Sequence, residues 1–238
     1  VNLPAGRYID LFTRQAYVVS DEFKQFKAYR GLGSIPVFVK YNSIIPLSED
    51  KGNGCDNPEN LRVLVYGDNA RFTMIEDNGN TARLETTYAV ENGGTEFTVI
   101  SSGDRSVSPS KRRITVEFMN IVDGACVSCA ENGEKVDFTV THNRCLKVAF
   151  DYLGGAAKVV VKANEKISDL TADSLGYAKS RMLSVIERCE GNNIEKENLF
   201  KALRDAGTEE EFIKILDDSF IKNVRKEQIK EFFNIIKW

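Results

Sequence analysis

Histidine is nearly absent from this sequence, and the single example, His142, limits the catalytic mechanisms that the chain can carry. Any Ser-His or Cys-His mechanism has to use this one imidazole. A histidine at the end of a strand-like segment, with no serine motif nearby, is more often a plain surface residue. We therefore assign no catalytic role to His142.

The sequence also lacks an excess of positive charge and any long apolar run. The formal net charge is -3, so no global basic field would attract nucleic acid. No apolar run approaches the roughly 20 residues that span a bilayer. The first residues, VNLPAGRYIDLF, lack the basic and apolar regions of a signal peptide. They begin without methionine and almost on a strand, which predicts a piece of a longer protein. From the net charge and the lack of long apolar runs, we expect neither nucleic acid nor a membrane as a partner.

Cysteine is too sparse, at five residues, to form the disulfide framework of a small secreted domain. Reduced thiols in a cytoplasmic protein are the favoured interpretation. The spacing of Cys126, Cys129, His142 and Cys145 would nevertheless suit a tetrahedral zinc ion. Residues three apart on a strand point to opposite faces, so only loop conformations would bring the four together. We expect no metal and no cofactor, and keep these four residues as the alternative zinc site.

Up to about Asn164 the sequence consists of short segments with apolar residues at every second position. Each segment ends in Gly, Asn, Asp or Ser, at the spacing of an all-β sandwich. In RITVEF, for example, Ile114, Val116 and Phe118 share one face. The same pattern marks RVLVYGDN, RFTMIEDNGN, TEFTVISSGD, KVDFTVTHN, LKVAFDYLGG and KVVVKAN. Burying each large apolar side chain is worth about 1.5–3 kcal/mol, so a sandwich core is expected.

After Asn164 the apolar period becomes helical. A first helix is predicted by a stripe of residues at three- and four-residue spacing, Leu175, Ala178, Met182, Ile186 and Cys189, with Gly191 as its stop. Further helices are predicted around Leu199 to Leu203, after a capping box of Thr208 with Glu211, and around Ile229 to Ile236.

The predicted helices contain five phenylalanines, Phe200, Phe212, Phe220, Phe232 and Phe233. Two interpretations follow from so many large apolar groups. They are buried on one another and on the sandwich, which we favour, or they form a protein-interaction or oligomerisation surface.

The segment LGSIPVFVKYNSIIPL places two β-branched runs close together. Pro36 and Pro46 belong at strand starts, edges or bulges because proline donates no backbone hydrogen bond. Asn42 is expected to turn the chain, since asparagine tolerates a left-handed backbone. The segment therefore predicts a strand, a kink and a second short strand.

Three smaller motifs are interpreted as structural. GLGS, residues 31–34, precedes a strand and is a turn rather than a dinucleotide-binding loop. EDNG, residues 76–79, offers paired carboxylates but is typical of a hairpin turn. KRR, residues 111–113, is interpreted as a solvated strand start. Tyr88, Tyr152 and Trp238 are weak candidates for stacking on sugar, and each is more often a packing residue.

Three segments in order resemble glycoside hydrolase family 31, which contains α-glucosidases and α-xylosidases. Residues 3–13, LPAGRYIDLFT, are similar to the strand pair LPxGxWxDxxTG that follows the catalytic barrel of that family. Residues 32–47 resemble its LDxIPVFVRxGSIIPL. Residues 61–81, LRVLVYGDNARFTMIEDNGNT, resemble its LxVxVY…FxxYEDDGxT, where the proximal C-terminal β-domain passes into the distal one. The resemblance covers about the first third of the chain.

The sequence departs from the family pattern at six positions, Tyr8 for Trp, Arg14 for Gly, Gly33 for Asp, Asn42 for Gly, Ile75 for Tyr and Asn78 for Asp. Each replacement fits a strand or a turn, so the expected fold is kept. The resemblance implies that the catalytic aspartates lie on barrel loops upstream, because retaining hydrolysis needs two carboxyl groups about 5–5.5 Å apart. We therefore expect no catalytic residue in this chain.

Together these observations predict a mainly β chain with an all-α C-terminal part. The expected domains are a partial proximal β-sandwich over residues 1–66, a distal antiparallel β-sandwich over 67–163 and a small helical bundle over 164–238. By resemblance, the chain is the non-catalytic C-terminal part of a retaining α-glycosidase and contacts its (β/α)8 barrel. The alternatives are a carbohydrate-binding module or an interaction module that pairs two copies through the helical tail.

Overall fold

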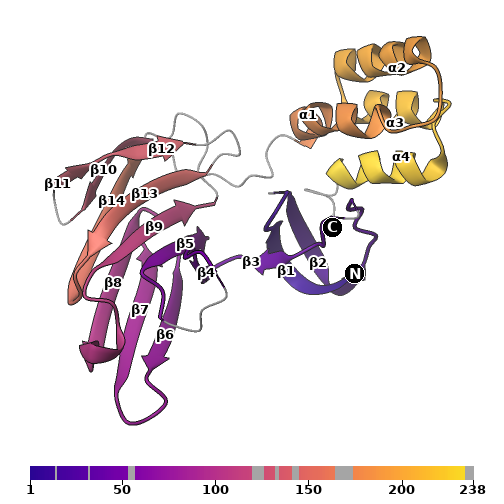
Figure 1. The fold of residues 1–238 in the computed structure, drawn as a ribbon. Coiled ribbons are helices and arrows are strands. Elements are labelled where there is room, and N and C mark those ends of the chain that lie inside the picture. Colours follow the sequence, from indigo (N-terminus) through magenta and orange to yellow (C-terminus); the bar gives the residue numbers. More distant parts are fainter. Residues whose placement is uncertain are drawn as a thin grey trace. The chain divides into compact units, whose positions relative to one another are not determined.

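The computed structural model describes residues 1–13, 15–31, 33–52, 57–119, 126–131, 134–140, 145–163 and 174–233. For residues 20–24, 126–131, 134, 140, 162–163 and 174 within these ranges, only the backbone is described. The described chain is mainly β, with three sheets and four α-helices near the C-terminus (Figure 1). The predicted fold class, mainly β with a helical C-terminal part, is confirmed at this level.

The contacts group the chain into two compact units. Val1–Val39 and Leu170–Trp238 form one, which we call the terminal unit, and Lys40–Asp169 form the other, which we call the β-unit. The predicted division into domains after residues 66 and 163 stays a prediction. The two units are instead separated after Val39 and after Asp169. None of the described helices is long and apolar enough to cross a membrane.

The terminal unit begins with a small sheet of strand order β2-β1-β3. Its strands are β1 Asn2–Asp10, β2 Ala16–Gln25 and β3 Phe38–Lys40. Aromatic rings fill the buried side of this sheet, with Tyr17 stacked on Phe26 at 5.2 Å and Phe38 meeting Tyr17 edge to face at 5.1 Å. These rings give the short sheet a core of its own, because each aromatic side chain removes a large area from water.

The terminal unit continues with four amphipathic helices, α1 Ser174–Ile186, α2 Asn193–Asp205, α3 Glu209–Asp217 and α4 Asn223–Lys230, and the 3-10 turn η2 Glu231–Phe233. The predicted stripe on α1 is confirmed, since Ala178, Met182 and Ile186 are almost fully buried in the helical core. Phe212 and Phe233 lie in the same core with Phe200 and Phe232 packed against it, whereas Phe220 is 44% exposed.

The helix ends follow from capping chemistry. Thr208 accepts a hydrogen bond from the Glu211 backbone N–H at 3.2 Å, as its sequence spacing predicted. The Glu211 carboxylate accepts a hydrogen bond from the backbone N–H of Gly207, not from that of the cap residue Thr208. A second, complete capping box at Asn192 and Glu195 starts α2 and was missed, although Asn followed three residues later by Glu is a signature of a helix start.

The β-unit contains two sheets, of strand order β11-β10-β14-β8-β7-β6 and β12-β13-β9-β5-β4. The strands are β4 Ser43–Ser48, β5 Asn60–Tyr66, β6 Ala70–Asp77, β7 Arg83–Glu91, β8 Glu96–Gly103, β9 Arg112–Phe118, β10 Cys126–Glu131, β11 Glu134–Val136, β12 Phe138–Val140, β13 Leu146–Tyr152 and β14 Ala156–Ala163. A 3-10 turn, η1 Arg105–Val107, lies between β8 and β9. Neighbouring strands are antiparallel except β5 and β9, which run parallel.

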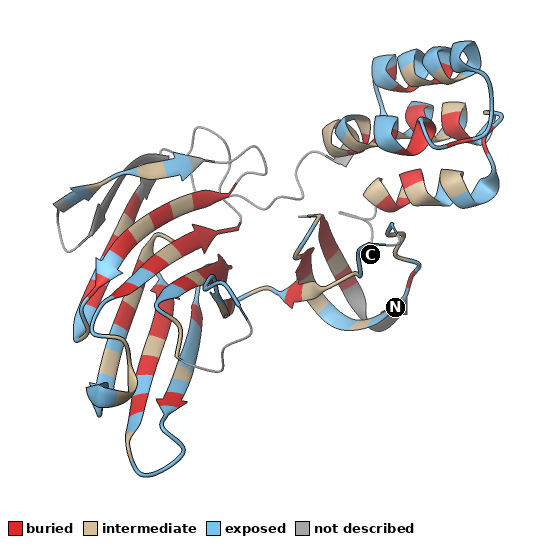
Figure 2. Cartoon of the chain, viewed as in Figure 1, coloured by how far each residue is buried: buried red, intermediate tan, exposed pale blue. Residues whose placement is uncertain are grey.

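Both sheets of the β-unit contribute side chains to one hydrophobic core. Figure 2 shows burial alternating with exposure along these strands, as the period of two in the sequence predicted. Ile114, Val116 and Phe118 of β9 face this core and are at most 1% exposed. Val159 of β14 and Phe97 of β8 face the same core and are equally buried. Because the core is continuous across residue 66, the strands on either side of it stabilise one another.

The segment with two β-branched runs forms the expected strand, kink and strand. β3 ends at Lys40, β4 begins at Ser43, and Asn42 between them has a left-handed φ of 62°. The Asn42 side chain accepts hydrogen bonds from the backbone N–H groups of Asp68 and Asn69, at 3.0 and 3.3 Å. Pro46 lies on β4, which is an edge strand, so its missing N–H costs no ladder bond.

Candidate functional site

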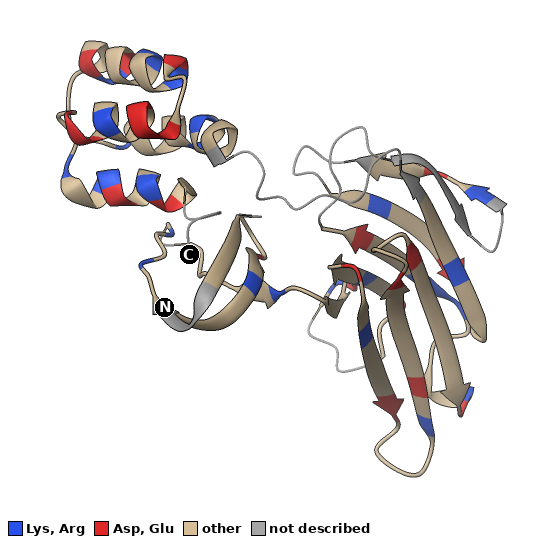
Figure 3. Ribbon diagram, turned by 180° about the vertical axis from the view of Figure 1, so that it is seen from behind, with Lys and Arg blue, Asp and Glu red and all other residues tan. Residues whose placement is uncertain are grey.

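Charged side chains that are buried in this chain form defined clusters, and they are the first place to look for chemistry. Figure 3 shows acidic and basic residues mixed along the helices, with fewer charges on the strands. Of the residues whose side chains are described, four carboxylates are almost completely buried, Asp10, Glu76, Glu117 and Glu231. Each of them faces at least one arginine or lysine, as a buried charge requires.

The largest cluster lies in the terminal unit around Arg30. This guanidinium donates to Asp10 Oδ2 at 2.8 Å and to Glu231 Oε1 at 3.0 Å. Asp10 also accepts from the backbone N–H groups of Phe12 and Thr13, at 2.9 and 2.7 Å, which shapes the turn after β1. The aspartate of the LPAGRYIDLFT segment is therefore occupied on both oxygens.

Glu231 joins the C-terminal turn η2 to the N-terminal sheet. Its carboxylate accepts from the Tyr17 hydroxyl at 2.8 Å and from the Tyr29 backbone N–H at 2.8 Å, in addition to Arg30. Its backbone carbonyl accepts from the Gln15 side chain at 2.6 Å. Glu231 thus satisfies polar groups of four residues among the first 30, Gln15, Tyr17, Tyr29 and Arg30.

Burial, followed by the Glu231 carboxylate, raises the pKa of Tyr17 well above its ordinary value of 10.0 against the opposing effect of Arg30. The Arg30 pKa is raised too: burial lowers it, but Tyr17, Asp10 and Glu231 together outweigh that effect. Arg30 therefore stays a cation and Tyr17 a neutral donor at any physiological pH. Both states suit a fixed structural network rather than proton transfer.

The second cluster lies in the β-unit and joins its two sheets. Arg112 of β9 forms a bidentate ion pair with Glu76 of β6, at 2.9 and 2.6 Å, and both side chains are at most 3% exposed. Arg112 Nε also donates to the Pro58 carbonyl at 2.8 Å. The interpretation of residues 111–113 as a solvated strand start is therefore wrong for Arg112, whose position on β9 has the inward parity of Ile114.

The flanking basic residues behave as the sequence suggested. Lys111 and Arg113 are about half exposed and both contact Asp151, at 2.8 and 3.1 Å. Hydrogen bonds from Lys111 and then Arg113 lower the pKa of the Asp151 carboxyl. On the same sheet, Glu117 of β9 lies 3.4 Å from Lys147 and 3.8 Å from Arg62.

This arrangement does not provide the carboxyl pair of a retaining glycosidase. That reaction needs a nucleophile and an acid/base on opposite sides of an accessible sugar. Asp10, Glu231 and Glu76 are instead buried and bound to arginine, so a sugar cannot reach them. Among the described residues, the buried acids hold the fold together.

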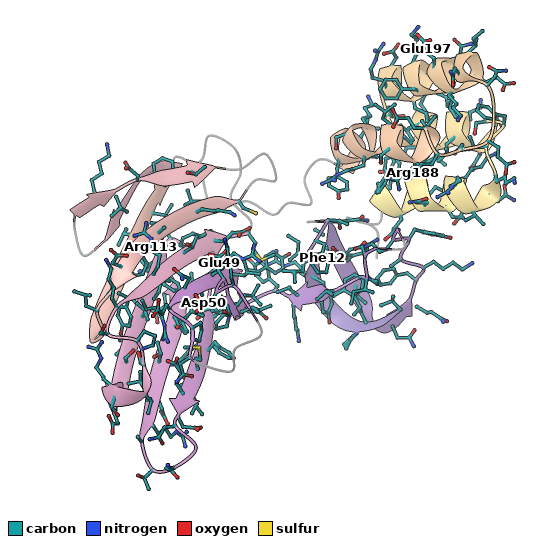
Figure 4. The ribbon with its side chains drawn as sticks, viewed as in Figure 1. Phe12, Glu49, Asp50, Arg113, Arg188 and Glu197 are labelled. Carbon is teal, nitrogen blue, oxygen red and sulfur yellow. The ribbon has the colours of Figure 1, made fainter. Side chains whose placement is uncertain are left out.

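Two hollows in the surface of the β-unit adjoin at Pro109. One, of 430 Å³, is lined by Asn57, Asp77, Asn78, Ser106, Val107, Ser108 and Pro109. The other, of 310 Å³, is lined by Glu59, Asn60, Pro109, Ser110, Lys111 and Arg113. Figure 4 labels Asp50, which accepts hydrogen bonds from the backbone of the lining residues Glu59 and Asn60, and Arg113 of the same lining.

A third hollow, of 270 Å³, lies between α1 and α2 of the terminal unit. Its lining includes the apolar residues Leu183, Ile186 and Phe200 and the acidic residues Glu187 and Glu197. Glu197, labelled in Figure 4, is paired with Lys201 at 2.7 Å. This hollow is smaller and more apolar than those of the β-unit.

The four residues of the alternative zinc site are only partly described. Cys126 and Cys129 lie on β10, with their side chains not described, and His142 lies outside the described residues. Cys145 is buried, with its thiol beside the Met119 carbonyl. No group of three metal-binding side chains occurs among the residues described, and the zinc site stays an untested alternative.

The aromatic candidates for sugar stacking are packing residues where they are described. Tyr88 is fully buried, and Tyr152 is 6% exposed with its hydroxyl donating to the Gly155 carbonyl at 2.6 Å. Trp238 lies outside the described residues. The two smaller motifs are also structural, since Ser34 N donates to the Gly31 carbonyl and residues 76–79 lead into the β6–β7 hairpin.

Comparison with solved structures finds folds similar to this one. A dextranase of glycoside hydrolase family 31 from Flavobacterium johnsoniae, solved with isomaltotriose and with glucose, matches with a TM-score of 0.53 and 18% identity over 68% of this chain. A protein of Listeria monocytogenes solved with glucose matches at 0.49 and 16% identity, over 69% of this chain and 17% of its own. A Gracilariopsis lemaneiformis α-1,4-glucan lyase matches at 0.44 and 13% identity, over 67% and 20%.

The likeness to the dextranase is one of fold. The matched part spans only 24% of the dextranase chain. No family model and no curated protein match the sequence. The chain therefore shares the fold of part of a family 31 glycosidase, at a sequence identity that carries no information on substrate.

Proposed function

We propose that this chain is the non-catalytic C-terminal part of a retaining α-glycosidase related to glycoside hydrolase family 31, and that it supports an upstream catalytic barrel. Two independent lines support the proposal. The fold matches part of a family 31 dextranase. The three motif-like segments, residues 3–13, 32–47 and 61–81, occur in the family's order.

The observation that carries the non-catalytic role is the state of the buried acids. Asp10, Glu76 and Glu231 each accept a hydrogen bond from a buried arginine, and Asp10 and Glu231 also accept from backbone N–H groups. A carboxylate held in this way stabilises its neighbours but does not attack a sugar. Catalytic carboxylates are then to be found on the barrel.

The three motif-like segments form strands and turns whose backbone is held by side chains, as a supporting domain requires. Residues 3–13 form β1 and the Asp10-centred turn, residues 32–47 contain β3, the Asn42 kink and β4, and residues 61–81 contain β5 and β6. In each, a polar side chain fixes the backbone, so the segments are suited to holding a defined shape against a neighbouring domain.

Activity measurements on two proteins test this function. The purified 238-residue chain is expected to release no product from an aryl α-glucoside, whereas the protein expressed from the complete reading frame is expected to hydrolyse it with retention. Turnover by the chain alone, lost in a Glu76→Gln or Asp77→Asn variant, would contradict the non-catalytic role. A complete protein without any activity on α-linked glycosides would contradict the family relationship.

A further inference from the structure

The adjoining hollows of the β-unit form a groove, which we define by the residues lining them on either side of Pro109. We propose that this groove binds a neutral oligosaccharide. The inference goes beyond the supporting role, because a chain that only buttresses a barrel needs no ligand site of its own.

The backbone of the groove is fixed in advance by hydrogen bonds between the backbone and side chains at its edges. Asp50 accepts from the backbone N–H groups of Glu59 and Asn60, at 2.7 and 2.9 Å, and holds one wall. Asp104 accepts from Ser106 N at 2.9 Å and holds the opposite wall. Asn57 donates to the Val107 carbonyl and links the two walls. Such preorganisation lowers the entropic cost of binding.

The groups presented to the groove are mostly amides and hydroxyls. The side-chain amides of Asn57 and Asn78 each use one polar atom in a hydrogen bond to the backbone and present the other to a ligand. Ser106, whose hydroxyl also bonds to Asp104, and Ser110 are exposed and add hydroxyl groups. Amides and hydroxyls both donate and accept, as the hydroxyl groups of a sugar do. The ring of Pro109, at the centre, offers a small apolar surface for the C–H face of a sugar.

The charge of the groove excludes strongly charged ligands. Its carboxylates are Asp77 and Glu59 and its cations are Lys111 and Arg113, so the lining is balanced. Lys111 and Arg113 are already paired with Asp151, which leaves little attraction for a phosphate or sulfate. Asp77 accepts from Gly79 N, and each of the two hollows has one carboxylate in its described lining, which is too few for a calcium site. The match is to an uncharged polyol.

Binding is expected to be weak, with a dissociation constant of about 1 mM, which corresponds to about 4 kcal/mol. The described lining contains no aromatic ring, and such rings provide large, rigid contact area in tight sites. Weak binding suits a site that keeps a polymeric substrate near an enzyme rather than one that turns it over.

Titration of the isotope-labelled 238-residue chain with maltotriose, isomaltotriose or xyloglucan fragments tests the proposal by NMR. The backbone signals of residues 57–60, 77–78 and 106–111 are expected to shift with at least one sugar. The double variant Asn78→Ala, Ser106→Ala is expected to weaken binding at least tenfold. Ser102→Ala, an exposed change on β8 outside the lining, is the matched control and is expected to bind as the wild type does.

Three outcomes would overturn the inference: no shifts with any neutral sugar at 10 mM or so (ten times the expected constant), shifts confined to other residues, or equal binding by the double variant. Shifts produced only by calcium or by a sulfated disaccharide would overturn it as well. A failed titration leaves the supporting role untouched, because that role is judged by turnover and not by binding to this groove.

Discussion

Individual residues in this chain show which features of a sequence reveal buried charge. The run Lys111-Arg112-Arg113 has the composition of a solvated cluster, yet Arg112 is almost fully buried and its neighbours are not. The signal was present in the parity: Arg112 is two residues before Ile114 and so faces the same core. Its partner was not predictable, because Glu76 lies 36 residues away on the other sheet.

Removal of Arg112 is the first prediction. Arg112→Met leaves the Glu76 carboxylate buried without its cation, so the free energy of unfolding of the β-unit is expected to fall by about 3–5 kcal/mol. Chemical denaturation followed by circular dichroism measures the change. The adjacent Arg113→Met is the matched control, and its loss is expected to stay below about 1 kcal/mol because Arg113 is half exposed.

A second variant separates the ion pair from general damage. In the double variant Arg112→Met, Glu76→Met, no uncompensated charge remains, so much of the lost stability is expected to return. A double variant as unstable as the sum of both single variants would show that the ion pair is not the reason for the loss.

The hydroxyl of Tyr17 gives a prediction on pH. Its pKa is raised in the folded protein by burial first and by Glu231 second. The unfolded chain loses this proton near pH 10, while the folded chain keeps it, so its contribution to stability is complete below pH 10 and is lost as pH rises further. Between pH 10 and 11.5 the free energy of unfolding is expected to fall with pH less steeply for Tyr17→Phe than for the wild type. The two slopes are expected to differ by about 1.4 kcal/mol per pH unit.

Urea titrations at several pH values measure this slope. At pH 8 the tyrosine is protonated in both states, so the difference there reports only the lost hydrogen bonds to Glu231 and Arg30. If the stability curves of the two proteins ran parallel from pH 8 to 11.5, Tyr17 would not be the group that titrates.

At the scale of elements, the sequence predicted most strands and helices because their apolar periods are clear. The stripe on α1 and the alternation on β9 are examples, and Thr208 marked the start of α3. β7 was missed as a separate strand because RLETTYAVE mixes charges with a short apolar run. KVDFTV was expected to be one strand and is divided into β11 and β12 around Asp137.

The kink between β3 and β4 gives a prediction on local structure. Gly67 has φ of 120°, and a Cβ added there would clash with the backbone and side chain of Asn42. Gly67→Ala is expected to destabilise the β-unit by about 1–3 kcal/mol through strain and displacement of Asn42. Thermal or chemical unfolding measures the loss.

Gly79→Ala is the control for this variant. Gly79 also has a left-handed φ, of 75°, but a Cβ there would meet open space. Its cost is expected to be smaller, at about 1 kcal/mol, because only the backbone conformation is disfavoured. Equal losses for the two glycines would show that contact with Asn42 does not matter.

At the scale of the whole molecule, the first 39 residues and the C-terminal helices belong to one unit. The sequence did not reveal this grouping, because periodicity reports neighbours along the chain and not partners more than 200 residues away. Glu231 has no sequence signal that sets it apart from other acidic helix residues. Its buried position, with bonds to Tyr17, Tyr29 and Arg30, makes the connection.

Removal of Glu231 is therefore expected to weaken both ends of the chain together. In Glu231→Ala, hydrogen exchange is expected to speed up in β1 and β2 as well as in α1 and α4, with a loss of about 3–5 kcal/mol for the terminal unit. Glu227→Ala, four residues earlier and exposed beside Lys230, is expected to change neither region appreciably. Faster exchange in the helices alone would contradict the shared unit.

The groove of the β-unit was also beyond prediction from sequence. The EDNG segment was interpreted as a hairpin turn, which the structure supports, but Asp77 and Asn78 meet Asn57 and Ser106 only through the pairing of the strands between them. Interpreting the EDNG segment as a turn does not reveal which distant residues lie beside it in the folded chain.

The central claim is that these 238 residues hold shape for a catalytic barrel encoded upstream. Sequencing the transcript on the 5′ side of the Val1 codon tests it most directly. The account predicts an open reading frame that encodes a (β/α)8 barrel with two aspartates on loops at the carboxyl ends of its strands. A stop codon followed by an initiation codon immediately before Val1, or an upstream domain of another fold, would contradict it.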